Sequence, residues 1–399
     1  MDNYQITFLN HSSFIMDIND FSVLVDPWYS GKVFNNSWSL IKDTDDSKID
    51  YSKLKYISIS HEHPDHFHIG TLKYIRAQTK NKITILFPKR ENPNVLEFCK
   101  KIGYDFKYIN YFTETKIEDN FEITAFPKHT PNDIDSALVY KVYDKIIVNQ
   151  NDAYLTDDIL EKLKIKFPDI DLWLCQFSLA GYYANRENLS ELYEKGTKYH
   201  MDSFFKYQNY LCPKMSIPFA SFVYFCKHYN NYINKYSVKL NELLKESKHI
   251  IQIPYYNERI SFTSVDKNDL HLSNWVKNKK AIKIDPAPKF PGEEQILSEL
   301  NKLYSDGYRV KKPVILQFFD YDKSLVINTS KWGKHNRFLF IDNKACNYPI
   351  TGKLPGEELM SYLKTPWGGD TLNITGCFDK VDSVAWGHFL AAREKLYKR

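Results

Sequence analysis

The sequence lacks several features that would place the protein in a specialised class. Its 399 residues contain six cysteines, none of them in a C-x-x-C pair, which disfavours a thiolate metal site or a disulfide-stapled fold. No apolar run reaches the length of a membrane-spanning helix. The net charge is only +5, and no basic stripe with interleaved aromatic residues is present. We therefore expect no membrane association, and nucleic acid is disfavoured as a partner.

The start of the chain also lacks the basic and apolar stretches of a signal peptide. Together with the scattered cysteines, this predicts a cytoplasmic location. Apolar residues make up 43% and charged residues 26%, the composition of an ordinary soluble globular protein. The length allows more than one domain. A proline-rich segment over residues 284–292 is the expected linker, so we predict a catalytic domain over 1–283 and an α+β accessory domain over 293–399.

The most informative stretch is residues 56–68, YISISHEHPDHFH. An apolar run, typical of a buried strand, ends at an H-x-H-x-D-H motif formed by His61, His63, Asp65 and His66. Four of the twelve histidines fall within residues 61–68. Neutral imidazole and carboxylate groups are common ligands of divalent ions. In an extended loop, His61 and His63 point the same way, while Asp65 and His66 can turn toward a second position. The motif therefore predicts a metal site.

The rest of the chain predicts alternating strands and helices, a layered α/β pattern. In the first domain we expect strands over 6–9, 14–16, 21–25, 83–87, 104–108, 121–126, 137–143, 145–148 and 172–175, and a strand-to-loop element over 216–222. We expect helices over 69–76, 94–101, 187–210 and 238–246. Beyond the linker we expect helices over 293–306, 356–363 and from 384, and strands over 314–318, 325–327, 338–341 and 371–374. His61, His129 and Asp152 each follow a β-rich run, a common way to bring ligands to one edge of a sheet.

Several other polar residues have two interpretations. His11 and Asp26 lie in turns that could flank the histidine loop. Each either holds a ligand histidine from outside or is a plain turn residue. Lys128 and the Tyr182–Tyr183 pair could contact an anionic substrate, or they could be ordinary surface and packing residues.

With the V-L-V-D-P-W strand at 23–28, the histidine loop, His129 and Asp152, the chain resembles the metallo-β-lactamase superfamily. The resemblance implies a four-layered αβ/βα sandwich, followed here by a C-terminal α+β extension, and a site for two metal ions. His61, His63 and His129 would hold one ion, Asp65 and His66 the second, and Asp152 would bridge both. A last histidine would complete the set. His228 is the first candidate, because it follows the 217–222 element, and His200 and His249 are the alternatives.

Within the superfamily, the chain resembles the lactamase-like part of CMP-N-acetylneuraminate hydroxylase. The similar stretches run from residues 128–131 through 149–152, then over 177–182, and then over 217–222 with His228, Tyr232 and Ile233. One departure is that the C-x-H…C-x-x-H ligand motif of a Rieske iron–sulfur domain does not occur in the sequence.

The resemblance leads to two enzymatic hypotheses and one non-catalytic one. The first is hydrolysis of a small, anionic, sugar- or nucleotide-like substrate by a water bound to two divalent ions, zinc before iron or manganese, with Asp65 and Asp152 positioning the water and accepting its proton. The second is a diiron oxygenase acting on a nucleotide sugar and fed by a separate electron-transfer partner. The third is a binding scaffold, which the intact ligand set disfavours. The oligomeric state is left open.

Overall fold

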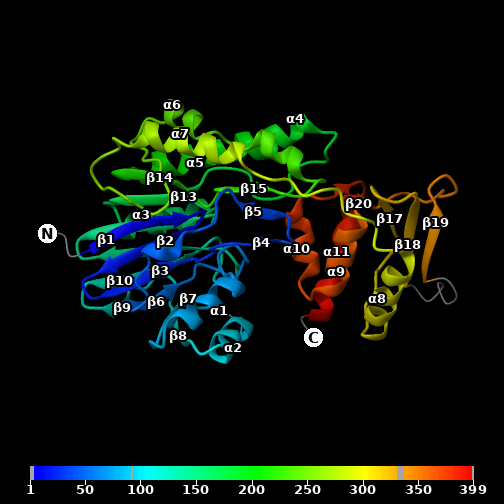
Figure 1. The fold of residues 1–399 in the computed structure, drawn as a ribbon, viewed down its shortest axis with the longest axis horizontal. Helices are drawn as coiled ribbons and strands as arrows, with labels where there is room; N and C mark the ends of the chain where they lie inside the picture. The colour runs from blue at the N-terminus through cyan, green and yellow to red at the C-terminus, as the bar shows by residue number, and fades with distance from the viewer. Residues whose placement is uncertain (1–3, 91–92, 330–336, 398–399) are drawn as a thin grey trace.

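The computed structural model describes residues 4–90, 93–329 and 337–397. Figure 1 shows two stacked sheets with helices on their outer faces and, beside them, a smaller unit formed by the C-terminal part of the chain. No helix in these described ranges is both long enough and apolar enough to cross a membrane. The predicted α/β class and the αβ/βα layering are confirmed.

The first sheet has seven strands in the order β16-β1-β2-β3-β6-β7-β8. These are β1 (Tyr4–Asn10), β2 (Ser13–Ile18), β3 (Phe21–Val25), β6 (Leu54–Ser58), β7 (Thr84–Pro88), β8 (Asp105–Ile109) and β16 (Glu258–Arg259). Strands β1 to β3 pair antiparallel, whereas β3, β6, β7 and β8 pair parallel. The carboxyl ends of β3 and β6 therefore lie at the same edge of the sheet.

The second sheet has six strands in the order β14-β13-β12-β11-β10-β9. These are β9 (Thr115–Glu118), β10 (Phe121–Pro127), β11 (Ser136–Val142), β12 (Lys145–Asn151), β13 (Leu172–Gln176) and β14 (Met215–Phe219). Strands β11 and β12 form the predicted hairpin, with Val142 opposite Lys145. Strands β12, β13 and β14 pair parallel.

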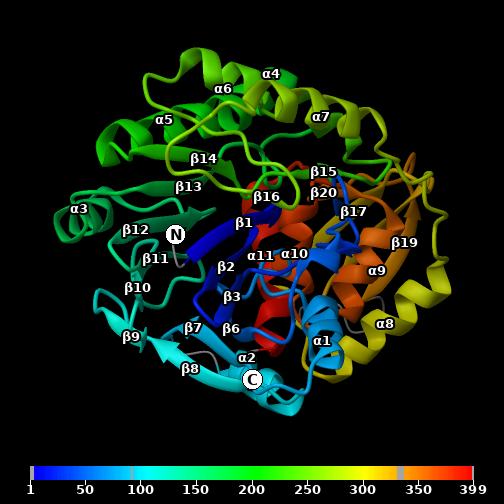
Figure 2. The same ribbon diagram turned by 60° about the vertical axis from the view of Figure 1, so that its left-hand side comes forward.

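Alternation along the strands builds the layers, because successive side chains point to opposite faces of a sheet. In β3, Val23 and Val25 contribute to the core between the two sheets. Leu24, between them, packs on the outer side with residues of α1 (Ile69–Gln78) and α2 (Pro93–Lys101). On the far side of the second sheet, the buried Trp173 ring lies 4.9 Å from Phe204 of α5 (Tyr199–Leu211). Figure 2 shows the same succession of layers from another side.

The first 283 residues contain further elements outside the two large sheets. They are β4 (Lys32–Val33), β5 (Trp38–Leu40) and β15 (Val223–Phe225), which form a small sheet, the short helix η1 (Asp46–Lys48), and the helices α3 (Asp157–Lys166), α4 (Leu189–Leu192), η2 (Tyr193–Lys198), η3 (Asn231–Tyr236), α6 (Leu240–Glu246) and α7 (Asn268–Lys280). The sequence analysis did not anticipate α3, α7 or the small sheet.

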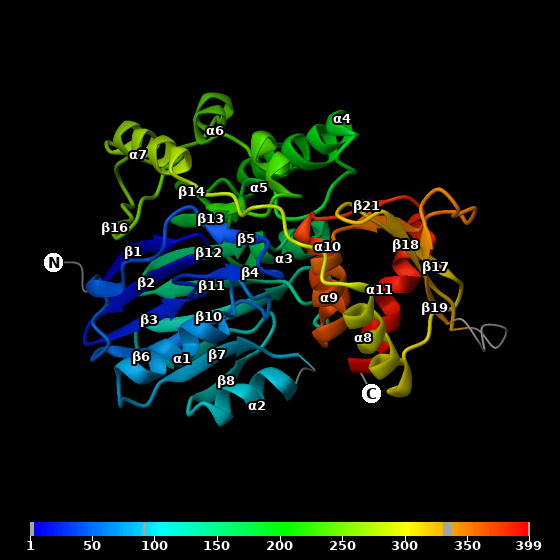
Figure 3. The ribbon, with the colours of Figure 1, turned by 45° about the vertical axis from the view of Figure 1, so that its right-hand side comes forward.

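In its described residues, 293–329 and 337–397, the C-terminal unit has a five-stranded sheet, β19-β18-β17-β20-β21, and four helices. Its elements are α8 (Glu293–Ser305), β17 (Val314–Phe318), β18 (Lys323–Ile327), β19 (Phe338–Asp342), β20 (Gly352–Leu354), α9 (Gly356–Lys364), α10 (Gly368–Thr375), β21 (Asp379–Lys380) and α11 (Ser383–Tyr397). Its buried core is built from residues 296–392, with Tyr182 packed against it. Figure 3 shows α9 and α10 facing the first unit near β4 and β5. The domain boundary at the proline-rich segment stays a prediction.

One predicted element is wrong. The sequence predicts a strand over residues 371–374, where Leu372 and Ile374 alternate with polar neighbours. They belong instead to helix α10. Leu372 is buried in the C-terminal core, whereas Ile374 packs against a cluster of the first unit that includes Trp28 and Trp38. A short segment with apolar residues two positions apart fits either structure, and here the packing on two sides decided for the helix.

Candidate metal centre

The centre begins where two parallel strands end side by side. Val25 of β3 lies opposite Ser58 of β6, so the next residues of both strands emerge at the same edge. The Asp26 carboxylate accepts hydrogen bonds from the Ser60 backbone N–H and from the Ser60 hydroxyl, each at 2.7 Å. Asp26 adopts a left-handed backbone conformation, with φ of 40°. These contacts hold the start of the histidine loop against the end of β3.

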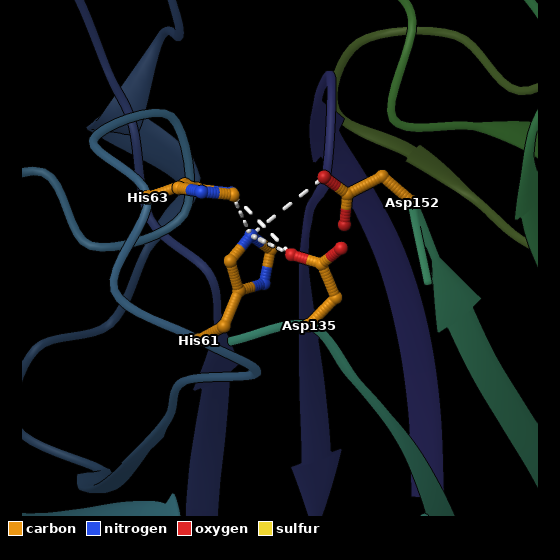
Figure 4. A group of neighbouring side chains, drawn as sticks. All are labelled: His61, His63, Asp135 and Asp152. Carbon is orange, nitrogen blue, oxygen red and sulfur yellow. Dashed lines mark hydrogen bonds and ion pairs between the residues drawn. The ribbon is translucent and has the colours of Figure 1, made fainter. Parts of the chain in front are cut away.

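The first donor group consists of His61, His63, Asp135 and Asp152, whose ligand atoms all lie within 4.8 Å of one another. Figure 4 shows the four side chains pointing toward a common space. His61 Nε2 lies 2.8 Å from His63 Nδ1, 3.6 Å from Asp152 Oδ2 and 3.9 Å from Asp135 Oδ1. Two ligands that each lie about 2.1 Å from one ion are separated by about 3.0–3.4 Å. The observed separations are close to that range, so the group can close around a single ion.

The two carboxylates of this group come from the second sheet. Asp152 follows β12 directly, after Asn151, whose left-handed φ of 45° turns the chain at the strand end. Asp135 directly precedes β11, and its Oδ2 accepts a hydrogen bond from Lys128 Nζ at 2.9 Å. The centre therefore lies between the two sheets, with histidines from one and carboxylates from the other.

The second donor group consists of His11, Asp65 and His66, all buried. His11, in the turn between β1 and β2, places Nε2 3.2 Å from Asp65 Oδ2. His66 Nε2 lies 3.5 Å from the same oxygen and 3.6 Å from Asp152 Oδ1. Since Asp152 Oδ2 faces His61 and Asp152 Oδ1 faces His66, one carboxylate links both groups.

Asp26 lies behind the second group rather than in it. Its Oδ2 is 2.9 Å from His66 Nδ1, which leaves His66 Nε2 facing Asp65 and Asp152. A carboxylate on the far nitrogen of a ligand histidine sets its tautomer and orientation. Asp26 thus occupies the outer position considered for it, whereas His11, considered for a similar outer position, lies among the candidate ligands themselves.

The pKa shifts of the donor residues favour the binding of cations in both groups. Burial lowers the pKa of His61 and of His11, which keeps these imidazoles neutral. Burial alone would raise the pKa of Asp152, but His61 and His66 hold it well below its usual range. Burial would likewise lower the pKa of His66, yet Asp152, Asp65 and Asp26 raise it well above the ordinary value. The field that stabilises a proton on His66 would also favour a metal cation at that place.

Several buried donor atoms have no hydrogen-bond partner among the described residues, which also fits a metal site. Four buried atoms make no hydrogen bond within the described part of the chain: His66 Nε2, Asp65 Oδ1, Asp135 Oδ1 and Asp152 Oδ1. Buried polar atoms normally have a partner, and a group of orphaned ones calls for an explanation. Two ions would satisfy all four, with His61, His63 and Asp135 around one, His11, Asp65 and His66 around the other, and Asp152 between them.

The structure does not bring every predicted ligand into these groups. His129 lies on an exposed loop, where its backbone N–H donates to Asp133 Oδ2 at 2.8 Å, and Asp135 lies in the first group where the resemblance implied a third histidine. His228 is exposed beside a cavity of about 360 Å³ next to the C-terminal unit. His200 is buried between Tyr154 and Tyr183, and His249 Nε2 donates to Asn209 Oδ1 at 3.0 Å.

Sequence reasoning therefore missed Asp135 and underrated His11. The sequence did contain a signal for Asp135. It lies just before the β-rich run at 137–143, as Asp152 lies after the β-rich run at 145–148.

The structure also shows where the residues considered for substrate contact lie. Lys128 is paired with Asp135. Tyr182 stacks on Phe378 of the C-terminal unit, with ring centroids 4.4 Å apart, and the Tyr183 hydroxyl accepts from the Ala180 backbone N–H.

Comparison with known proteins shows which proteins this chain is similar to. Residues 5–139 match the sequence profile of the β-lactamase superfamily domain. A candidate Rieske 2Fe-2S iron–sulfur protein from Mycolicibacterium smegmatis is 27% identical over 193 residues, covering 45% of this chain and 35% of that protein. Cytidine monophosphate-N-acetylneuraminic acid hydroxylase from Cricetulus griseus is 32% identical over 90 residues, covering 22% of this chain and 16% of the hydroxylase. The matched regions thus span about a third or less of these relatives.

Among solved structures, CmlA, a diiron β-hydroxylase from Streptomyces venezuelae, is similar with a TM-score of 0.43 and 10% identity, over 65% of this chain and 54% of CmlA. Igni18, a metallo hydrolase from Ignicoccus hospitalis, gives a TM-score of 0.43 and 14% identity, over 64% of this chain and 97% of Igni18. The resemblance inferred from the sequence is confirmed for residues 5–139, which match the β-lactamase superfamily domain.

Proposed function

We propose that the protein is a dinuclear metalloenzyme with iron at both positions, which hydroxylates a small anionic substrate using O2. The balanced reaction converts a substrate C–H bond, O2, two electrons and two protons into C–OH and water. The sequence had placed hydrolysis first and oxidation second. The donor set supports the opposite order.

The observation that carries the proposal is Asp135 in the first donor group. With His129 as ligand, the group would hold three imidazoles and the shared carboxylate, a set that suits zinc. With Asp135 it holds two imidazoles and two carboxylates, and the second group plus Asp152 has the same composition. Two histidines with carboxylate are typical of non-haem iron oxygenases, and carboxylate-rich dinuclear sites are typical of diiron proteins.

When bound, two such ions would supply the redox chemistry that activates O2. The residues of the chain hold and shield the reacting centre. Asp26 fixes the orientation of His66 through Nδ1, and the ionised Asp152 balances charge on both sides. Lys128, with its side chain 42% exposed, lies at the edge of the first group next to Asp135, where its ammonium group can attract an anionic substrate. We infer a sugar- or nucleotide-like molecule of that charge, in line with the substrate named for the hydroxylase relatives.

The sequence contains no Rieske ligand motif, which supports an electron source separate from these residues. Two of the relatives bear the name of a Rieske protein or of a hydroxylase, and most of their length lies outside the matched regions. We propose that a separate iron–sulfur protein or domain donates the electrons.

A second function, hydrolysis, is favoured by one observation. Asp65 Oδ1 is buried without a hydrogen-bond partner in the described part of the chain, and His66 and His11 lower the pKa of Asp65 against the effect of burial. An ionised carboxylate with a free oxygen can accept the proton of an attacking water. Elemental analysis separates the two functions, since zinc with no O2 consumption favours hydrolysis.

The decisive experiment compares ligand variants in matched pairs. The wild type, purified without added metal, should contain two equivalents of iron. Asp135→Ala should lose one equivalent while His129→Ala keeps both, and His11→Ala should lose one equivalent while His228→Ala keeps both. O2 consumption is then measured with a reductant and candidate CMP-sugars. Two equivalents of zinc, or iron retained in Asp135→Ala, would contradict the proposal.

A further inference from the structure

The segment Phe34–Asn36 forms a left-handed turn at the edge of the metal centre. The φ angles of Phe34, Asn35 and Asn36 are 50°, 56° and 58°. Asparagine tolerates this conformation, because its short side chain bonds locally, but a bulky residue such as phenylalanine rarely adopts it. Backbone strain of this kind persists only when the surroundings impose it, and it gathers at functional sites.

The turn places the Phe34 ring against a candidate metal ligand. Phe34 is only 5% exposed, and its ring packs on Trp38 with centroids 4.6 Å apart. The same ring lies 6.3 Å from the His63 imidazole, at an interplanar angle of 66°, within the edge-to-face range of aromatic pairs. The side chain of His63 is 28% exposed. Phe34 therefore covers one side of an imidazole ring that is partly accessible to solvent.

Hydrogen bonds within the first unit hold the backbone of the turn in place. The Ser37 backbone N–H donates to Val33 O at 3.0 Å and to Phe34 O at 3.1 Å. The Cys226 thiol donates to Asn36 O at 3.3 Å. These bonds tie the turn to the end of β15 and fix its direction, but none of them reaches the side chain of Asn35.

The C-terminal unit supplies the contact to Asn35. Asn35 Nδ2 donates to Glu358 Oε2 at 3.3 Å, and Glu358, on α9, is fully buried. The other oxygen of Glu358 accepts from Lys227 Nζ at 2.5 Å. Asn230 Nδ2 adds a second link, because it donates both to Ser37 O at 3.0 Å and to Thr375 O of α10 at 2.8 Å.

We propose that Phe34 is a positioning residue for His63, and that the C-terminal unit maintains this position through Glu358 and the left-handed turn. The accessory unit would then be part of the metal centre's support, although none of its described residues belongs to either donor group. This inference rests on the proposed function in one respect, since it takes His63 to be a metal ligand. Groups that orient a ligand from outside commonly change metal affinity by about ten- to a hundredfold when removed.

The test measures metal affinity of the first donor group in two variants. Phe34→Leu keeps an apolar side chain but loses the ring edge against His63. Asn35→Gly allows the left-handed backbone at no steric cost but loses the bond to Glu358. Ferrous ion is titrated anaerobically against a chelator of known affinity. In each variant we expect one of the two ions to bind about ten- to a hundredfold more weakly, with the other unchanged.

The chain offers a matched control for each variant. Phe112 also has a left-handed backbone, with φ of 61°, and its ring packs on Phe126 rather than on a histidine. Asn19, with φ of 52°, uses its side chain to accept a bond from the Tyr143 hydroxyl at 2.5 Å. Phe112→Leu and Asn19→Gly should both bind two ions with wild-type constants. Imidazole signals of His63, followed by nitrogen NMR in histidine-labelled protein, should shift in Phe34→Leu and not in Phe112→Leu.

The outcomes separate this inference from the proposed function. If the wild type binds two ions and both Phe34→Leu and Asn35→Gly bind them with the same constants, the inference is overturned and the metal centre stands. If the wild type binds no ion, both are overturned. If the first site weakens as expected but the wild type consumes no O2, the positioning role stands and only the oxidative reaction is lost.

Discussion

The buried ion pair between Lys227 and Glu358 should be a main source of cohesion between the two units. The side chain of Lys227 is 8% exposed and that of Glu358 is 1% exposed, and the atoms lie 2.5 Å apart. Burial lowers the pKa of Lys227, but Glu358 outweighs it and raises the pKa. Lys227→Met would leave a buried carboxylate without its cation, which typically costs about 3–5 kcal/mol.

The assay is urea unfolding followed by tryptophan fluorescence, since Trp386 lies in the C-terminal core and Trp173 in the first unit. The free energy of unfolding should fall by about 3–5 kcal/mol in Lys227→Met. Lys227→Met/Glu358→Gln should recover most of that loss, because no uncompensated charge then remains. The surface pair Lys198–Asp202, 52% and 64% exposed, is the control, and Lys198→Met should cost at most about 1 kcal/mol.

The loss should also depend on pH, with a sign that the structure sets. Burial raises the pKa of Glu358 above its ordinary value, and removal of Lys227 takes away the main opposing charge. Between the unfolded and the folded pKa the folded variant binds a proton that the unfolded chain does not, so its stability falls as pH rises. Lys227→Met should therefore be less stable at pH 8 than at pH 5.5, relative to the wild type. A loss under about 1 kcal/mol at pH 8, comparable to that of Lys198→Met, would refute the reasoning.

Three further predictions concern single residues. Asp26→Asn should weaken binding of one metal ion by about ten- to a hundredfold, measured by chelator competition, and unchanged binding would contradict the outer role of Asp26. Burial lowers the pKa of His200 to about 3, so the unfolded chain binds a proton first as pH falls below about 6.5. The free energy of unfolding should then drop by up to about 1.4 kcal/mol per pH unit on acidification, less steeply in His200→Asn. Leu174→Ala, at a fully buried site of β13, should cost about 2–5 kcal/mol in urea unfolding, whereas Ile165→Ala, at a site that is 73% exposed, should cost under about 0.5 kcal/mol.

Local chemistry made much of the fold predictable. The expected strands and helices of the first domain occur within a few residues of their predicted ends, because period-two alternation and short turns are properties of neighbouring residues. The 187–210 region was expected as one helix, and it is a succession of α4, η2 and α5. The segment 371–374 shows the limit, since its pattern fits a strand and its surroundings on two sides require a helix.

Some residues of the candidate metal centre could also be predicted from the sequence, and others could not. The sequence by itself determined the histidine loop, since an apolar strand that ends in H-x-H-x-D-H must present those side chains together. It also determined Asp152, at the end of the β11–β12 hairpin. Only the tertiary structure shows that Asp135, and not His129 six positions earlier in the same loop, lies in the first donor group. The choice follows from the antiparallel register that places Pro127 opposite Ser136 and from the turn in which Asp133 holds the His129 backbone.

The same holds for the histidine that completes the second donor group. His11 and His228 are both histidines in loops after strands, and nothing local distinguishes them. Folding places the β1–β2 turn over Asp65, whereas His228 ends beside the C-terminal unit. A ligand shell is closed by residues distant in the chain, and their distances from one another depend on how sheets pair and stack. A sequence motif identifies the candidate ligands that are neighbours in the chain. The packing of the two sheets determines which distant residues join them.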